Sequence, residues 1–418
     1  MGLLLTLLGS TAQAQITRTW DGGGTNNNWS TAGNWSSDNV PDGPGEAALF
    51  TDDPVGKTKL TPNLSATVTN GQVQFSATAP SYTITGSATL YLSPAASFGG
   101  VGLTVASGAA NQTISAAEVF FLSSQSWDIG GTTILTVSGT IEDDSVIDYG
   151  LTKNGSGTLV FPGDVRYDGA TTNNGGSLVL SFSNTSMLSA FTVNAGILRA
   201  TTSANALGNN ATRNTITLAG GALELANNTG LAFGPASRIT TVTGNTTIRS
   251  DRLTAGAGVT HTLGTLRIGA QTLSVAAGGF VNSGIAGMTF GTATLSANGA
   301  VFDVASGANL TLDALVGNFT FTKQGSGQLT LNTAANANRT SATVTLSSGT
   351  MRLGNASALG TAAVPLTLNG GTLDLAINGS VNAHNTTVGG NATIVSDRSA
   401  GGGGVTNTLG MLGIGAQT

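Results

Sequence analysis

The sequence has 418 residues, no cysteine, two histidines and 61 glycines, with only 8% charged residues and a net charge of −5. The lack of cysteine excludes a disulfide framework and thiol-rich metal sites, and 15 Lys and Arg in all argue against a nucleic-acid partner. An apolar share of 39% is enough for a continuous core. The surface must then consist of Thr, Ser, Asn and Gly, which disfavour helices and suit short strands between tight turns.

The first segment reads as a signal peptide. Residues 2–9 (GLLLTLLG) form an apolar run that is too short to span a bilayer, and Ala12-Gln13-Ala14 follows as an A-x-A cleavage pattern. We therefore expect residues 1–14 to be removed before Gln15. The alternative is an apolar N-terminal strand, because the run has no positively charged start.

Residues 15–60 are rich in Trp, Asn and Gly. Their three tryptophans, Trp20, Trp29 and Trp35, lie among asparagines and could stack on sugar rings. We favour an N-terminal cap over the hydrophobic end of a repetitive fold, because solenoids need caps to stay soluble.

One dense acidic cluster precedes the repeats, with Glu142, Asp144 and Asp148 as its candidate ligand-binding residues. Residues two positions apart on a strand share a face, so Glu142 and Asp144 could bind calcium or act as an acid and base pair. Asp and Ser are also common in turns, and a solvated turn is the interpretation we favour.

From residue 151 the chain repeats itself. LTKNGSGTLVF (151–161) returns as FTKQGSGQLTL (321–331), and IRSDR (248–252) returns as IVSDR (394–398). We therefore expect a duplicated copy at roughly 151–320 and 321–418, with the second copy cut off and any anchor beyond residue 418. The Ser-Asp-Arg residues kept in both copies indicate a corner ion pair or an Asp that caps a turn.

Short alternating segments, such as GSLVL (176–180), GALEL (221–225) and GTLDL (371–375), recur between glycine turns over residues 61–418. Hairpin dipeptides are scarce, so antiparallel pairing by two-residue turns is not the rule. No helical period separates the strands, which excludes βαβ crossovers. These features predict an all-β, right-handed parallel β-helix, with roughly 16–20 coils of roughly 20–25 residues each.

Catalytic signatures are missing from the sequence. His261 aligns with Asn407 of the second copy, His384 stands alone, and no nucleophile elbow or phosphate-binding motif occurs. We therefore expect no catalytic residues, no metal, no cofactor and no enzymatic activity.

The Thr-Lys-x-Gly-Ser-Gly-x-Leu segments, followed in the first copy by Tyr167-Asp168-Gly169 and GGSLVL (175–180), resemble the autotransporter-associated β-strand repeat family. The resemblance implies a passenger region that is secreted or displayed on the outer membrane of a Gram-negative-type bacterium. It carries over no catalytic residues. We expect a stalk, adhesin or extracellular matrix component that contacts glycans or other cell surfaces, without a membrane span of its own. The alternative is a carbohydrate-active β-helix enzyme of the lyase or hydrolase type.

Overall fold

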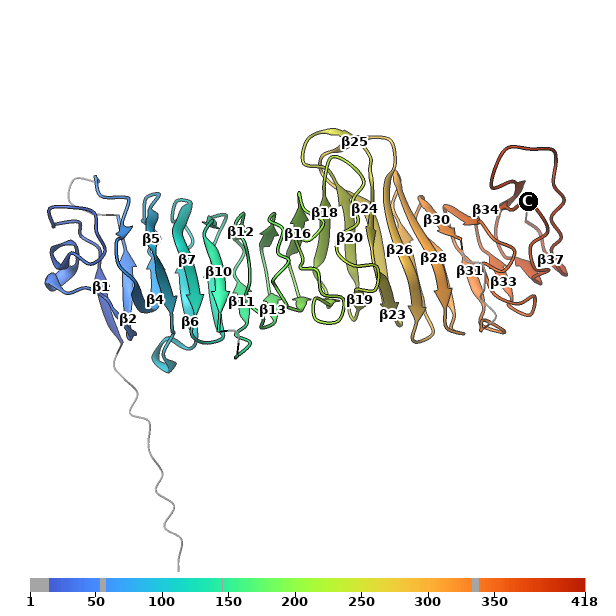
Figure 1. The fold of residues 1–418 in the computed structure, drawn as a ribbon. Helices are drawn as coiled ribbons and strands as arrows, with labels where there is room; N and C mark the ends of the chain where they lie inside the picture. The colour runs from blue at the N-terminus through green and yellow to red at the C-terminus, as the bar shows by residue number, and fades with distance from the viewer. Residues whose placement is uncertain (1–14, 53–57, 145, 333–337, 418) are drawn as a thin grey trace, which may run out of the picture. The chain divides into compact units, whose positions relative to one another are not determined.

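The computed structural model describes residues 15–52, 58–144, 146–332 and 338–417. The chain divides into two compact units, residues 1–169 and 170–418, and each is a parallel β-solenoid (Figure 1). The described residues contain no α-helix, and their named strands pair in parallel. The all-β parallel solenoid predicted from the sequence is therefore confirmed, while its right-handedness stays a prediction. The predicted signal peptide, residues 1–14, lies outside the described residues.

The first unit begins with two 3-10 turns, η1 (Ala32–Asn34) and η2 (Ser36–Asp38), and has another at η4 (Ala96–Phe98). Its successive strands stack so that, for example, β6, β8 and β11 lie side by side. The strands are β1 (Ile16–Thr19), β2 (Gly43–Phe50), β3 (Asn63–Leu64), β4 (Val68–Phe75), β5 (Thr83–Leu92), β6 (Val101–Val105), β7 (Gln112–Phe121), β8 (Gln125–Ile129), β9 (Ile134–Val137), β10 (Thr140–Asp143), β11 (Leu151–Asn154) and β12 (Thr158–Phe161).

In the second unit the strands of each turn pair with those of the next turn and form continuous parallel stacks, and a small separate pair, β21 with β25, projects from them (Figure 1). Its strands are β13 (Thr171–Asn173), β14 (Ser177–Leu180), β15 (Phe191–Val193), β16 (Ile197–Thr201), β17 (Ile216–Leu218), β18 (Ala222–Ala226), β19 (Ile239–Val242), β20 (Thr246–Asp251), β21 (Gly256–Ala257), β22 (Thr260–Leu263), β23 (Thr265–Ile268), β24 (Thr272–Ala277), β25 (Val281–Ser283), β26 (Ala286–Leu295), β27 (Ala300–Val304), β28 (Ala308–Val316), β29 (Phe321–Gln324), β30 (Gln328–Leu331), β31 (Val344–Leu346), β32 (Thr350–Leu353), β33 (Leu366–Leu368), β34 (Gly371–Ala376), β35 (Thr386–Val388), β36 (Ala392–Asp397) and β37 (Leu412–Ile414).

The core follows from the alternation of side chains along each strand. In β15, Phe191 and Val193 point inward and are buried, while Thr192 between them faces outward. Val193 lies opposite Leu218 of the next turn. Each such aliphatic side chain contributes about 1.5–3 kcal/mol when it is fully buried, so stability accumulates along the stack.

The turns are longer and fewer than the sequence predicted. One turn takes 20 residues where Ser177 lies opposite Ile197, and 30 residues where Val73 lies opposite Leu103. The solenoid therefore has about 15 turns, and the expected 16–20 coils were too many. The estimate was wrong because surface loops, such as the one carrying β21, add residues without adding a turn.

Candidate functional site

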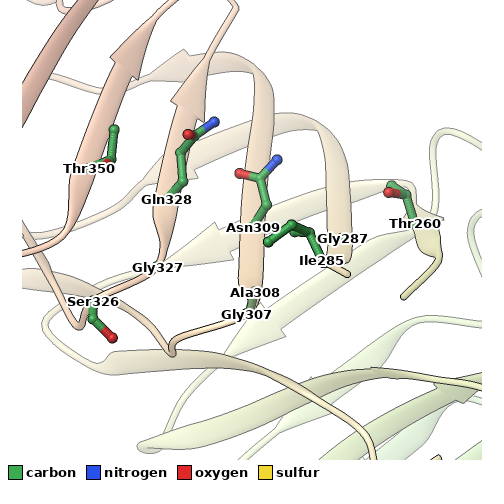
Figure 2. Close-up of a pocket in the computed structure, with 10 residues that line it drawn as sticks. All are labelled: Thr260, Ile285, Gly287, Gly307, Ala308, Asn309, Ser326, Gly327, Gln328 and Thr350. Atoms are coloured by element: carbon green, nitrogen blue, oxygen red, sulfur yellow. The ribbon is translucent and has the colours of Figure 1, made fainter. Parts of the chain in front are cut away.

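A groove of about 480 Å³ lies on the outer surface of the second unit (Figure 2). It follows a row of residues in register, one from each of five successive strands. Figure 2 shows the amides of Asn309 and Gln328 projecting side by side from neighbouring strands of this row. The row consists of Thr260 (β22), Gly287 (β26), Asn309 (β28), Gln328 (β30) and Thr350 (β32).

A chain of hydrogen bonds holds the two amides in place. Gln328 Nε2 donates to Thr330 Oγ1 over 2.9 Å, and Thr330 Oγ1 donates to Asn309 Oδ1 over 3.3 Å. Asn309 Nδ2 in turn donates to Thr311 Oγ1 over 3.4 Å. An amide has two N–H donors and a carbonyl acceptor, so these bonds orient the groups without using all their positions.

The hollow exists because Gly287 has no side chain. A Cβ at this position would lie 2.2 Å from Thr260 Oγ1, so no larger residue fits without a shift of Thr260. The residues lining the groove include no Asp, Glu, Lys, Arg or His, and Ile285 at its edge is 58% exposed. The groove therefore offers hydrogen bonds and apolar contact to a ligand, but no group for acid or base chemistry.

A second cluster lies on the outer surface of the first unit and contains Glu142. Arg166 Nη1 lies 3.7 Å from Glu142 Oε2, and Arg166 Nε lies 2.8 Å from Asp164 Oδ2. Glu118 of the neighbouring turn is the carboxylate that acts on Glu142, and its Oε2 accepts from Thr89 Oγ1 at 2.7 Å. Burial and the Glu118 carboxylate raise the pKa of Glu142, and the Arg166 guanidinium opposes the rise.

Two aromatic rings adjoin this cluster. Tyr91 and Phe120 are register neighbours on β5 and β7, with ring centroids 5.2 Å apart, and Phe120 is itself opposite Glu142. Both rings are half-buried, so part of each face is open to solvent. Glu118, Arg166 and both rings were not predicted from the sequence, because only the register of the turns brings them together.

Asp144 and Asp148 lie in the segment after β10, the strand that holds Glu142. Both are exposed, and Asp144 Oδ1 accepts a hydrogen bond of 2.9 Å from the Val146 N–H, as in a turn. Asp143, between Glu142 and Asp144, is buried, and its Oδ2 accepts from the Tyr149 N–H at 2.8 Å. Burial raises the pKa of Asp143.

The three tryptophans of the N-terminal segment form one buried cluster. Trp20, Trp29 and Trp35 are fully buried, and Trp35 lies 4.7 Å from Trp29 and 5.1 Å from Trp20 between ring centroids. All three rings pack on Phe50 of β2. A sugar-stacking platform needs an exposed ring face, and none of these three rings has one in this structure.

Both histidines are fully buried, and their rings hydrogen-bond to backbone groups. His261 Nδ1 accepts from the Leu231 N–H at 3.2 Å, so its Nε2 donates to the Asp251 carbonyl at 2.9 Å. His384 Nδ1 lies 3.0 Å from the Val364 carbonyl oxygen. Burial lowers the pKa of each imidazole, which keeps both rings neutral.

The repeated Ser-Asp-Arg residues anchor a surface loop in each copy. Ser250 Oγ donates to the Val259 carbonyl over 2.8 Å, and Ser396 Oγ repeats this bond to Val405 over 3.3 Å. Asp251 forms its ion pair with Arg199, two turns away. The neighbouring Arg252 instead donates to carbonyls of its own loop, including that of Ala257 at 2.9 Å.

The lysine of each Thr-Lys-x-Gly segment points into the core. Lys323 is fully buried between Phe302 and Leu346 of the adjacent turns, and its Nζ donates to the carbonyls of Gln324 at 2.7 Å and Gly325 at 2.8 Å. Lys153 of the first unit is likewise buried, and its Nζ donates to the Gly155 carbonyl at 3.1 Å. Burial lowers the pKa of each lysine to about 8.

Neither a metal site nor a helical membrane span is found in the part of the chain that the structure describes. No three His, Asp or Glu side chains there gather in a way that could hold a metal ion. No helix in those residues is long and apolar enough to cross a membrane.

Comparison with protein families identifies the repeated segments. Residues 151–180 and 321–353 each match the family model described as Passenger-associated-transport-repeat. No curated protein and no solved structure matches the chain. The fold and the two matches together define an autotransporter passenger-type β-solenoid. The chain carries two copies of the passenger-associated transport repeat, which confirms the resemblance seen in the sequence.

Proposed function

We propose that the chain is a non-enzymatic, secreted or surface-displayed passenger that acts as a stalk and adhesive surface toward glycans or other cells. The two transport repeats support the surface location. A parallel solenoid can bind a partner at many points along its length, because each turn presents the same kind of outward side chain at a fixed spacing.

The observation that carries this proposal is a pair of threonine rows on the second unit. Each row has one outward threonine from each of four consecutive strands, in register. Uncharged hydroxyls at a spacing of about 4.8 Å can make many weak hydrogen bonds to a polyhydroxylated surface. The rows are Thr172, Thr192, Thr217 and Thr241, and Thr322, Thr345, Thr367 and Thr387.

Binding to immobilised glycans and to whole cells tests this role, with the chain coupled to beads in many copies so that avidity counts. The variant T192V/T217V/T241V removes three hydroxyls and keeps the β-branched shape, and T345V/T367V/T387V does the same in the other row. We expect weaker retention in at least one of the two variants. No retention of the wild type on any glycan or cell surface would contradict an adhesive role.

The Glu118 and Glu142 pair supports a second candidate, a carbohydrate-active enzyme. A carboxyl group with a raised pKa beside another carboxylate is suited to acid catalysis, and the half-buried rings of Tyr91 and Phe120 could seat a sugar. The variants E142Q and E118Q, assayed for release of reducing ends from a panel of polysaccharides, test this candidate. It requires cleavage by the wild type that both variants lose.

A further inference from the structure

We propose that the groove beside Asn309 and Gln328 binds one uncharged, extended glycan chain that lies across the successive turns of the second unit. The inference rests on the proposed adhesive function and names its site and ligand class. It starts from the five-residue row that borders the groove and runs perpendicular to the strands.

The row matches a linear polymer because its period is fixed by the fold. Neighbouring strands of a sheet lie about 4.8 Å apart, so the five strands from β22 to β32 span about 19 Å. This is the length of a short oligosaccharide. The groove follows the same direction, since its lining comes from all five turns.

The lining provides the two kinds of contact that a neutral sugar needs. The amides of Asn309 and Gln328 offer donors and acceptors together, as hydroxyl groups require, and Thr330 holds both amides in a fixed orientation. The exposed Ile285 and the glycine floor give apolar contact to the C–H face of a ring. Little side-chain entropy is lost on binding when the amides are already ordered.

The absence of ionisable side chains from the lining argues against a charged ligand. A uronic acid or phosphate would find no cation in the groove. Arg352, the register neighbour of Thr330, is already engaged by the carboxylates of Asp374 and Asp397. A charged polymer would have to break these ion pairs to gain a partner.

A peptide is also a poor fit to this groove. Peptides commonly add as a strand to an open sheet edge, where backbone N–H and C=O groups are unpaired. Here β28 is paired with β26 and β30, and β30 is paired with β28 and β32. The groove therefore presents side chains, and its backbone has no edge to extend.

Saturation-transfer NMR with the full chain tests the proposal, with neutral β-linked hexasaccharides of glucose, mannose and N-acetylglucosamine as probes. Oligogalacturonate of the same length serves as the charged probe. The double variant N309A/Q328A removes both amides. The variant S326W keeps both amides and fills the groove with a large side chain from an exposed turn position. The control T136V removes a hydroxyl from β9 of the first unit, outside the groove and outside both threonine rows.

We expect at least one neutral hexasaccharide to bind, and both groove variants to weaken it about tenfold or more, since two hydrogen bonds are lost or blocked. T136V should bind as the wild type does. Stronger binding of oligogalacturonate, or binding that both groove variants leave unchanged, would overturn the assignment of the groove while leaving the adhesive function in place. Failure of the wild type to bind any hexasaccharide, glycan surface or cell would overturn both.

Discussion

Arg199 and Asp251 are 52 residues apart in the sequence, yet Arg199 Nη1 lies 3.2 Å from Asp251 Oδ2. The same guanidinium contacts Glu224 on the turn between them. The second copy repeats the arrangement, because Arg352 Nη1 contacts Asp374 and lies 3.2 Å from Asp397 Oδ2. In each copy one arginine therefore ties three successive turns together along the outer surface.

The first prediction is that Arg199→Met weakens this part of the fold more than Arg352→Met does. Asp251 is 1% exposed, so losing its cation leaves a buried charge unpaired, at a cost of about 3–5 kcal/mol. Asp397 is 49% exposed and water can replace its partner, so the second loss should be small. Hydrogen exchange across β16, β18 and β20, compared with β32, β34 and β36, measures both effects. Equal loss of protection in the two variants would contradict this explanation.

The second prediction concerns Lys323. Burial lowers its pKa from 10.5 to about 8. The unfolded chain then keeps a proton that the folded chain releases between pH 8 and 10.5, so this residue makes the free energy of unfolding rise with pH in that window. Lys323→Met should cost about 1–3 kcal/mol at pH 7, because the carbonyls of Gln324, Gly325 and Ser348 lose a donor.

Urea unfolding of the wild type and Lys323→Met at pH 7 and pH 9.5 provides the measurement. The difference between the two proteins should grow at the higher pH, since only the wild type gains from release of the proton. Lys153 is as fully buried as Lys323 and its pKa is lowered to the same value, so Lys153→Met should behave alike. A difference that shrinks with rising pH would show that the ammonium form is the more stable one in the core.

The alternation of residues was enough to predict the strands and their inward faces. The same alternation could have predicted that Lys323 is buried, because Phe321 and Lys323 are two positions apart and so face the same interior. The contact between Arg199 and Asp251 could not be predicted in this way. It depends on the lengths of the intervening loops, which set the register of the turns and follow no period.

The groove was unpredictable for the same reason. Gly287, Asn309 and Gln328 have no common motif, and they line up only because the turns between them take 22 and 19 residues. The Glu142 cluster also depends on the register of the turns, and here the spacing along one strand suggested the wrong neighbours. Spacing on a strand put Glu142 with Asp144, whereas stacking of the turns puts it with Glu118 and Arg166.

The third prediction concerns the first glycine of the Thr-Lys-x-Gly segments. Gly325 has a φ of 75°, and a Cβ there would lie 2.3 Å from the Val304 carbonyl oxygen. Gly325→Ala should therefore cost about 2 kcal/mol or more, from left-handed strain and from the clash. Gly155 of the first unit has a φ of 77° and a Cβ would lie 2.1 Å from the Ile129 carbonyl oxygen, so the same cost is expected there.

Gly279→Ala is the matched control for this glycine test. No heavy atom would lie within 4 Å of its Cβ, so the change should be neutral or stabilise the fold by about 0.4–1 kcal/mol. Thermal unfolding followed by circular dichroism compares the three variants. If Gly279→Ala lowers the melting temperature as much as Gly325→Ala does, the added methyl group itself explains the effect and the left-handed corner does not.

The fourth prediction tests the proposal that residues 15–60 cap the solenoid. Trp35 is fully buried against Trp20, Trp29 and Phe50, and its Nε1 donates to the Trp29 carbonyl over 2.6 Å. Trp35→Ala should cost about 3–5 kcal/mol by leaving a cavity at the centre of the cluster. Because Phe50 is stacked on Phe75 of the next turn, with centroids 5.2 Å apart, loss of hydrogen-exchange protection should spread from β2 into β4. Trp35→Phe, which keeps a ring in place, should lose much less. Protection in β4 that stays at the wild-type level in Trp35→Ala would mean that the first turns hold themselves together, and that the tryptophan cluster covers them without supporting them.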